Sequence, residues 1–246
     1  MSFDNSLKIS QGLLAATGTR MFVHYEDRIP HDCAVIVVSN HRGFLDAPLL
    51  MAALGHPIRM ACHHYMGQVP MMREIVTQLG GFPLKQPEHR QQAFLEQATQ
   101  LLIQRQWVGV FPEGAQPMVQ LTKPDVVGKF HRGFAHLALR APVRDLAVLP
   151  VAIASLDETV HSAVPLRFLR LFDPSEPLFA QPGWHPMVIH RRAAVLVGHP
   201  YWITPAHQEQ YQGKQAKIAV TQLVTTCRDE ISKLLHQFFQ REQTLS

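Results

Sequence analysis

The sequence contains few cysteines, and no apolar run stands near its N-terminus. Of its 246 residues only Cys33, Cys62 and Cys227 are cysteines, and they are far apart and form no CxxC pair. An odd, scattered set argues against a disulfide framework and a zinc ribbon, so we expect a reducing, cytoplasmic compartment. The N-terminus MSFDNSLKIS has an acidic residue near its start and no apolar segment, so we expect no secretory signal.

A long hydrophobic run is also missing. The longest apolar stretches, 33–38 and 146–154, are much shorter than the roughly 18–20 residues that a membrane-spanning helix needs, and Pro150 interrupts the second. We therefore expect the chain not to be an integral membrane protein. Glycine and proline, with 14 and 18 residues, are near their ordinary abundance, which excludes collagen-like and low-complexity chains.

Charge of either sign is sparse. Charged residues make up 17% of the chain, and 23 Lys and Arg against 19 Asp and Glu give a net charge of +4 with histidine neutral. This mild excess permits attraction to an anionic surface or a small anionic substrate, but it is too small to indicate a nucleic-acid partner.

Strand-like and helix-like segments alternate along the chain. The apolar, largely β-branched run 33–38 is typical of a strand buried on both faces, and Asp46 followed by Pro48 is typical of a helix start. We expect further strands at 58–62, 107–111, 147–154 and 193–198, and helices at 5–22, 46–54, 70–79, 91–106, 130–140 and over about the last 30 residues. The segment 161–192 breaks this rhythm and receives no assignment. The alternation predicts a single-domain, layered α/β fold over 1–246, with a mostly parallel or mixed central sheet flanked by helices.

The first candidate site follows the strand at 33–38. Its sequence, Asn40-His41-Arg42-Gly-Phe-Leu-Asp46, places a histidine in a loop and an aspartate at the next helix start. A carboxylate that folds back onto one imidazole nitrogen fixes the tautomer and leaves the other nitrogen available as a base. The spacing also suits a histidine and an aspartate that merely cap a loop and a helix.

The second candidate site is Phe111-Pro-Glu113-Gly114-Ala115, at the end of the strand 107–111. Residues at the carboxyl ends of strands lie where open α/β sheets bind ligands, and Glu113 is suited to accept hydrogen bonds from a polyol. The alternative is an ordinary strand-ending turn, because proline and glycine favour turns.

Taken together, the two stretches resemble the phospholipid/glycerol acyltransferase family, which includes the lysophosphatidic acid acyltransferases. Asn40, His41 and Asp46 match the family's NHxxxxD motif, and residues 111–114 match its FPEG motif. Ala115 and Gln116 depart from the hydroxyl and basic residues that usually follow FPEG.

Weaker matches extend this resemblance over about residues 33–235, which we take as the catalytic core. Residues 80–85 approximate the family's GxxFxxR motif, with Lys85 in place of arginine. Residues 148–151 match its hydrophobic strand with a proline, and 129–135 are similar to its Lys-x-Gly-x-x-x-Ala segment.

The resemblance implies a reaction and a role for each matching residue. His41 would remove a proton from an acceptor hydroxyl, which attacks the thioester of an acyl-CoA or acyl-carrier protein, and Asp46 would orient His41. No cofactor and no metal ion are implied. The implied acceptor is a glycerol phosphate or lysophospholipid, and the implied substrate-binding residues are Asn40, Arg42, Phe82, Lys85, Glu113, Gly114, Lys129 and Arg132.

Three alternatives stay open at this point. Gln116 and Lys85 weaken the expected phosphate contacts, so the acceptor could be a non-phosphorylated lipid alcohol. The His–Asp pair could activate water, which would make the protein a thioester or lipid ester hydrolase. The protein could also be a lipid-binding module with a decayed active site.

A lipid product implies peripheral association with a membrane surface. The segments 7–22 and 166–187 are candidates, and the second combines aromatic residues with Arg167 and Arg170, which suits a membrane interface but also a buried acyl-chain site. Cys62, His63 and His64 lack metal-ligand spacing, so we expect no metal site.

Overall fold

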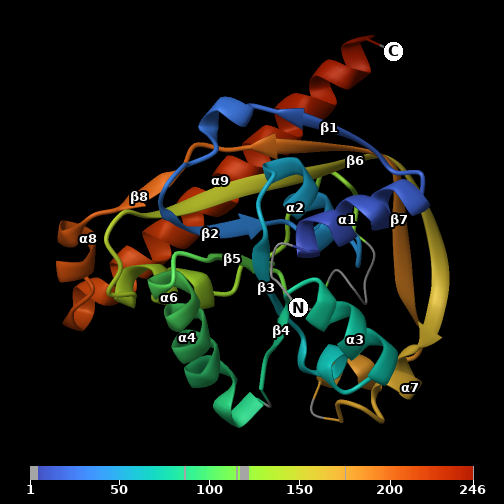
Figure 1. Ribbon diagram of the computed structural model, residues 1–246, viewed down its shortest axis with the longest axis horizontal. Helices are drawn as coiled ribbons and strands as arrows, with labels where there is room; N and C mark the ends of the chain where they lie inside the picture. The colour runs from blue at the N-terminus through green and yellow to red at the C-terminus, as the bar shows by residue number, and fades with distance from the viewer. Residues whose placement is uncertain (1–4, 86, 115, 117–121, 175, 246) are drawn as a thin grey trace.

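The computed structural model describes residues 5–245 apart from 86, 115, 117–121 and 175. Within these residues an eight-stranded sheet runs through the molecule in the order β1-β7-β6-β2-β5-β3-β4, with β8 paired to β6 (Figure 1). The strands are β1 (Arg20–His24), β2 (Ala34–Ser39), β3 (Ile58–Cys62), β4 (Phe82–Pro83), β5 (Trp107–Val110), β6 (Leu146–Pro165), β7 (Trp184–Val197) and β8 (Tyr201–Ile203).

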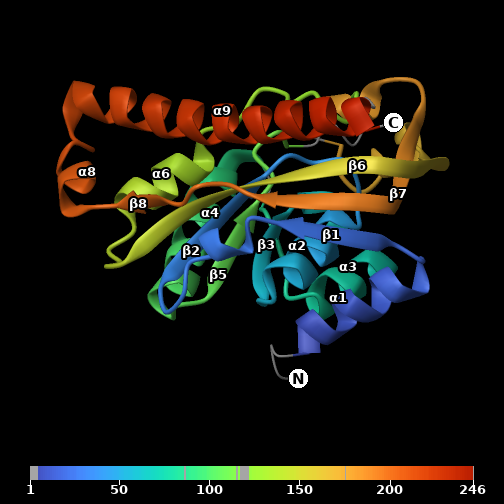
Figure 2. The same ribbon diagram turned by 90° about the horizontal axis from the view of Figure 1, so that it is seen from above.

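Helices cover both faces of this sheet. They are α1 (Asn5–Ala16), α2 (Asp46–Leu54), α3 (Pro70–Gln78), α4 (Pro87–Ile103), α6 (Gly133–Arg140), α7 (Leu166–Leu169), α8 (Pro205–Glu209) and α9 (Gly213–Leu245). Short 3-10 turns add η1 (Glu26–Arg28), η2 (His64–Gly67) and η3 (Pro177–Ala180). Figure 2 shows α9 along one side of the sheet and α1, α2 and α3 on the other.

The sheet is mixed. β6, β2, β5, β3 and β4 are parallel neighbours, whereas β7 runs antiparallel to β6. This confirms the predicted single-domain α/β fold with a mixed central sheet flanked by helices. The wholly buried strand β2 lies between β6 and β5, as its continuous apolar run predicts.

The alternation of side chains along β2 divides the core between two helical layers. Ile36 and Val38 pack in the cluster that contains residues of α4, α6 and α9. Val35 and Val37 pack in the cluster that contains residues of α1 and α2. Because successive strand residues point to opposite faces, one short strand contributes to both cores.

The N-terminal segment differs from the predicted helix over 5–22. Helix α1 ends at Ala16, Gly18 adopts a positive φ of 68°, and residues from Arg20 onward form β1, which pairs in parallel with β7. The left-handed backbone at Gly18 ends the helix. Residues 20–24 then form hydrogen bonds with β7 and so become a strand. Leu7 and Leu14 of α1 pack with the α2 core cluster.

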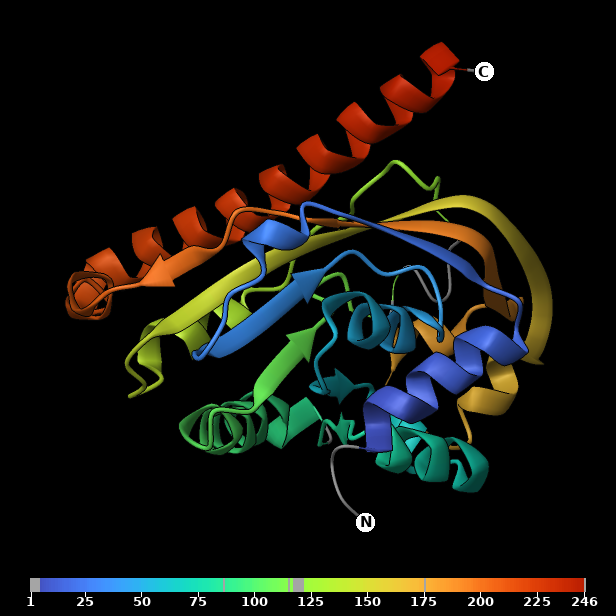
Figure 3. The ribbon, with the colours of Figure 1, turned by 45° about the horizontal axis from the view of Figure 1, so that its top comes forward.

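The segment 161–192 contains the end of β6, the start of β7 and the connection between them, which includes α7 and η3. β6 extends to Pro165 and β7 begins at Trp184, so both strands are far longer than predicted. The outer halves carry polar and exposed residues and therefore lack the apolar run that marks a buried strand. Figure 3 shows the β6–β7 hairpin bending strongly away from the centre of the sheet.

Among the described helices, none is long and apolar enough to cross a membrane.

Candidate active site

Both sequence motifs lie at one edge of the sheet. β2 and β5 are adjacent parallel strands, so the residues after Ser39 and after Val110 emerge side by side. This edge, at the carboxyl ends of parallel strands, is where open α/β sheets place their ligands.

His41 and Asp46 form a close pair. Imidazole Nδ1 of His41 lies 2.7 Å from Oδ2 of Asp46, which is completely buried at the start of α2. The His41 ring stacks on Phe111, with 4.1 Å between the ring centroids. The stacking and the carboxylate fix the ring, so Nε2 is the nitrogen available to a substrate.

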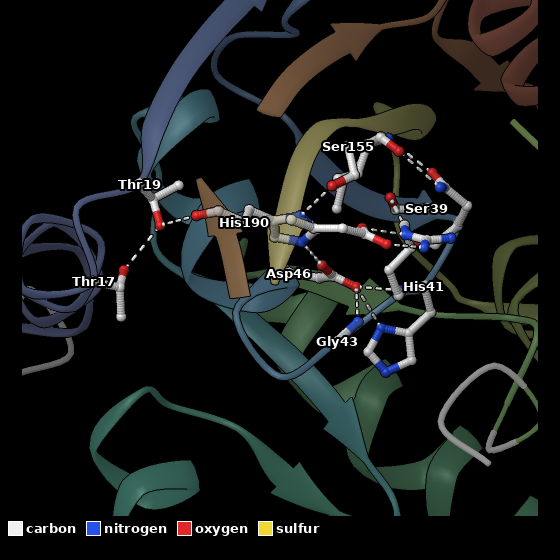
Figure 4. Close-up of polar contacts among 12 residues, drawn as sticks. Thr17, Thr19, Ser39, His41, Gly43, Asp46, Ser155 and His190 are labelled. Carbon is white, nitrogen blue, oxygen red and sulfur yellow. Dashed lines mark hydrogen bonds and ion pairs between the residues drawn. The ribbon is translucent and has the colours of Figure 1, made fainter. Parts of the chain in front are cut away.

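Asp46 accepts hydrogen bonds from several elements (Figure 4). The backbone N–H groups of Arg42 and Gly43 donate to Oδ2 at 2.6 and 2.8 Å, and Nε2 of His190 lies 2.8 Å from Oδ1. Burial alone would raise the pKa of Asp46, but the hydrogen bonds from His190 and His41 outweigh it and hold the pKa well below its usual range. The carboxylate is therefore ionised, and the proton in its bond with His41 resides on Nδ1.

Glu113 joins two loops at the same edge. Its Oε1 accepts from the backbone N–H of His41 at 3.0 Å, and its Oε2 accepts from the backbone N–H of Gly128 at 2.7 Å. Burial raises the pKa of Glu113, although these backbone donors oppose the shift. Gly114 follows with a φ of 68°, and a Cβ there would lie only 3.2 Å from the His131 ring. A side chain at position 114 would therefore crowd the site.

Asn40 and Arg42 point into the fold. The Asn40 amide is doubly paired with the backbone of Ile153 on β6, at 2.9 and 2.8 Å. The buried Arg42 guanidinium forms a two-point ion pair with Glu158 of β6 and donates to the Thr122 carbonyl at 2.9 Å. Asn40 thus fastens the motif loop to the backbone of β6, and Arg42 fastens it to the Glu158 side chain and the Thr122 carbonyl. A substrate contact by either residue remains a prediction.

A cavity of about 1060 Å³ opens beside the His41–Asp46 pair, and His41 lines it. Its volume exceeds the usual range for small-molecule sites, which leaves room for a long apolar group. Four predicted substrate-binding residues line it: Glu113, Gly114, Lys129 and Arg132. Apolar side chains line much of the rest, including Met51, Met60, Val76, Leu79, Phe94 and Phe179.

The remaining predicted binding residues do not line this cavity. Phe82 is buried in the core, where its ring stacks against Phe94. Lys85 is exposed and lines a separate groove of about 440 Å³ with His64 and His89. Of the two motif departures, Ala115 lies outside the described residues, whereas Gln116 lines the main cavity.

Sequence reasoning missed His190 and its neighbours. His190 lies on β7 in the segment left unassigned, and its Nδ1 lies 2.9 Å from the Ser155 hydroxyl on β6. Glu158, the partner of Arg42, lies on the part of β6 beyond the predicted strand 147–154. No local spacing signals these residues, because the strand pairing alone brings them to the motif loop.

The histidines near β3 have separate partners. His63 pairs with Glu176 at 2.8 Å, His64 lies 3.0 Å from the Leu84 carbonyl, and His56 stacks on Trp107. Within the part of the chain that the structure describes, no group of three or more His, Cys, Asp and Glu side chains is arranged to hold a metal ion.

An imidazole–carboxylate pair thus lies beside a large, partly apolar cavity, at the carboxyl ends of the parallel strands of an α/β sheet. The chain belongs to the acyltransferase family, whose sequence model matches residues 20–154, and it is therefore an acyltransferase. This confirms the phospholipid/glycerol acyltransferase resemblance.

The crystal structure of the 1-acyl-sn-glycerophosphate (LPA) acyltransferase from Thermotoga maritima has a similar fold. The TM-score is 0.60 at 16% sequence identity, and the similarity covers 96% of this chain and 79% of the Thermotoga chain. At this identity the similarity establishes the shared fold. No curated protein sequence matches the chain.

The Arg42–Glu158 pair yields a first prediction. We expect Arg42→Met to lower the free energy of unfolding by about 3–5 kcal/mol, because it leaves a largely buried carboxylate unpaired, and Arg42→Met/Glu158→Leu to recover most of that loss. Urea unfolding measures both. If Arg42→Met instead unfolds like the wild type but has a raised KM for a substrate, Arg42 contacts that substrate.

Proposed function

We propose that the protein transfers a fatty acyl group from a thioester donor, acyl-CoA or acyl-carrier protein, to a hydroxyl of a glycerol phosphate or lysophospholipid. The observation that carries this proposal is the His41–Asp46 pair at the edge of a large cavity with a partly apolar lining. The Thermotoga protein of similar fold is named for action on 1-acyl-sn-glycerophosphate, a substrate of this class.

In the proposed reaction His41 is the general base. Its Nε2 takes the acceptor's hydroxyl proton while the hydroxyl oxygen attacks the thioester carbonyl carbon. The tetrahedral intermediate then collapses, the carbon–sulfur bond breaks, and His41 returns the proton to the leaving thiolate. Asp46 keeps Nδ1–H oriented and stabilises the imidazolium that forms between these steps. The reaction needs no cofactor besides the thioester co-substrate.

Removing the base tests this mechanism. We expect His41→Ala to lower kcat for acyl transfer by about 10²–10⁴-fold, the usual contribution of general-base catalysis, with an unchanged melting temperature. The measurement is phospholipid formed from an acyl thioester and lysophosphatidic acid. The matched control is His56→Ala, because His56 stacks on Trp107 and does not line the cavity.

The outcomes of this assay separate the alternatives. Full transfer by a folded His41→Ala variant would refute the proposed base. Release of free fatty acid by the wild type, at a rate that an added acceptor does not change, would indicate a hydrolase. Tight binding of lysolipid without turnover of any thioester would indicate a binding module.

We further propose that Lys129 and Arg132 bind the acceptor phosphate. Both line the cavity, as does Arg90 of α4, whereas Lys85 lines the separate groove. Guanidinium and ammonium groups are the usual partners of phosphate, and three of them around one cavity favour an anionic acceptor.

Charge-removing variants test the phosphate site. We expect Lys129→Gln/Arg132→Gln to raise the KM for lysophosphatidic acid by about tenfold or more, because charge-assisted hydrogen bonds are lost, and Lys85→Gln to leave it unchanged. An unchanged KM in the double variant, together with efficient use of a neutral lipid alcohol, would assign the acceptor to the non-phosphorylated class. A raised KM in Lys85→Gln alone would restore Lys85 as the phosphate ligand.

We propose that the segment joining β6 and β7 rests on an anionic membrane surface. Phe168 and Leu171 of this segment and Trp184 at the start of β7 are more than half exposed, and Arg167 and Arg170 of the segment are exposed too. Aromatic and arginine side chains together suit the bilayer interface. Phe179 of the same segment is buried and lines the cavity, so the aromatic residues divide between the surface and the interior.

Two matched tryptophans test this surface. Trp184 is 54% exposed, and Trp202 is 47% exposed on β8, at the opposite end of the molecule from α7 (Figure 1). We expect Trp184→Ser to weaken binding to phosphatidylglycerol vesicles by about tenfold and Trp202→Ser to leave it unchanged. Vesicle co-sedimentation measures both, and added salt should weaken the wild type as the arginine contribution is screened. Equal binding by the two variants would contradict this docking surface.

A further inference from the structure

Asp46 has a second histidine partner on the side away from His41. Nε2 of His190 lies 2.8 Å from Oδ1, while Nδ1 of His41 lies 2.7 Å from Oδ2. Figure 4 shows the two imidazoles on either side of the carboxylate. His190 and Asp46 are both completely buried, so bulk solvent does not reach their hydrogen bond. Each of the two groups would lose a hydrogen-bond partner if the other were removed.

The hydrogen-bond partners fix the tautomer of His190. An ionised carboxylate only accepts hydrogen bonds, so Nε2 of His190 carries the proton that it donates to Asp46. In the neutral ring Nδ1 is then an acceptor, and it lies 2.9 Å from the Ser155 hydroxyl, which also hydrogen-bonds the Glu158 carboxylate. Thr19 adds a hydrogen bond of 2.7 Å to the His190 carbonyl, which fastens this part of β7 from the other side.

We propose that His190 is a positioning residue for the base: it holds the Asp46 carboxylate with Oδ2 turned toward His41. Oδ2 already accepts two backbone N–H groups besides His41, and Oδ1 is fixed by His190. A carboxylate held at both oxygens cannot rotate away from the His41 ring, which keeps the ring aligned as it gains and loses a proton. This inference rests on the proposed role of His41.

Among the described residues, three titratable side chains act on Asp46. His41 faces it from the motif loop, His190 faces it from β7, and Glu113 after β5 adds a second carboxylate nearby. Arg42 directs its backbone N–H toward Asp46 but directs its guanidinium to Glu158. Two side chains therefore donate to Asp46: His41, the proposed base, and His190, which takes no part in the proposed proton transfer.

Two amide substitutions of similar polarity distinguish positioning from mere packing. A glutamine amide nitrogen lies close to the place of Nε2 and can donate to Asp46, whereas an asparagine amide nitrogen lies close to the place of Nδ1 and faces Ser155. We expect His190→Gln to keep kcat within about threefold of the wild type and His190→Asn to lower it about 10- to 100-fold, with KM nearly unchanged in both.

The pH profile supplies a readout that a packing defect would not move. Without its donor on Oδ1, the Asp46 carboxylate becomes more basic and stabilises the His41 imidazolium more strongly. The acid limb of kcat/KM reports protonation of His41, so we expect it to move to higher pH in His190→Asn and not in His190→Gln. Equal kcat values and equal acid limbs in the two variants would overturn the proposal. Thermal unfolding of both variants confirms that folded proteins are compared.

A measurement on the unsubstituted protein covers the case in which a variant fails to fold. Nitrogen-15 labelling of histidine reports which ring nitrogen carries the proton, and we expect Nε2–H for His190, with its proton protected from exchange. An Nδ1–H tautomer would overturn the proposal without any substitution. His41→Ala, assayed in parallel, tests the proposed function separately, because loss of the base does not determine the His190 tautomer.

Discussion

The site depends on the hydrogen bonds that the buried carboxylate of Asp46 accepts. An ionised group without solvent is unfavourable unless donors surround it, and here the donors come from the motif loop and from β7. Meeting that requirement fixes the path of residues 40–46, the direction of the His41 ring and the position of His190. The large cavity then receives an imidazole whose remaining nitrogen is available, which is the minimum that acyl transfer by proton abstraction needs.

Several polar residues of the two motifs support the loop. Asn40 bonds to the backbone of Ile153, and Arg42 bonds to Glu158 and to the Thr122 carbonyl. Glu113 uses both carboxylate oxygens to join the His41 loop to Gly128. In this chain, therefore, several polar side chains of the two motifs bond to the protein itself. Lys129 and Arg132 lie on the cavity wall, in positions suited to a substrate.

Local patterns predicted the buried strands and the amphipathic helices, and they missed the elements that depend on distant partners. The apolar run of β2 and the Asp46–Pro48 start of α2 are visible in the sequence because burial and helix initiation leave local marks. The pairing of His41 with Asp46 was open to prediction because the four residues between them form a loop that can bring the two side chains together. His190 and Glu158 carry no such mark, since only the register of the β6–β7 hairpin brings them to the motif loop. β1 was missed because its strand conformation depends on the edge of β7.

The separations along the chain give the site an order of assembly. His41 and Asp46 are 5 residues apart, whereas Asp46 and His190 are 144 residues apart. Contacts of such high sequence separation form slowly, because a long loop must close before the contact stabilises anything. On a growing polypeptide the motif can form its turn early, but Asp46 gains its second imidazole only after β7 has been synthesised and docked. The enclosure of this charge therefore requires the chain as far as β7, and a chain without β7 would hold the motif but lack the donor to Oδ1 of Asp46.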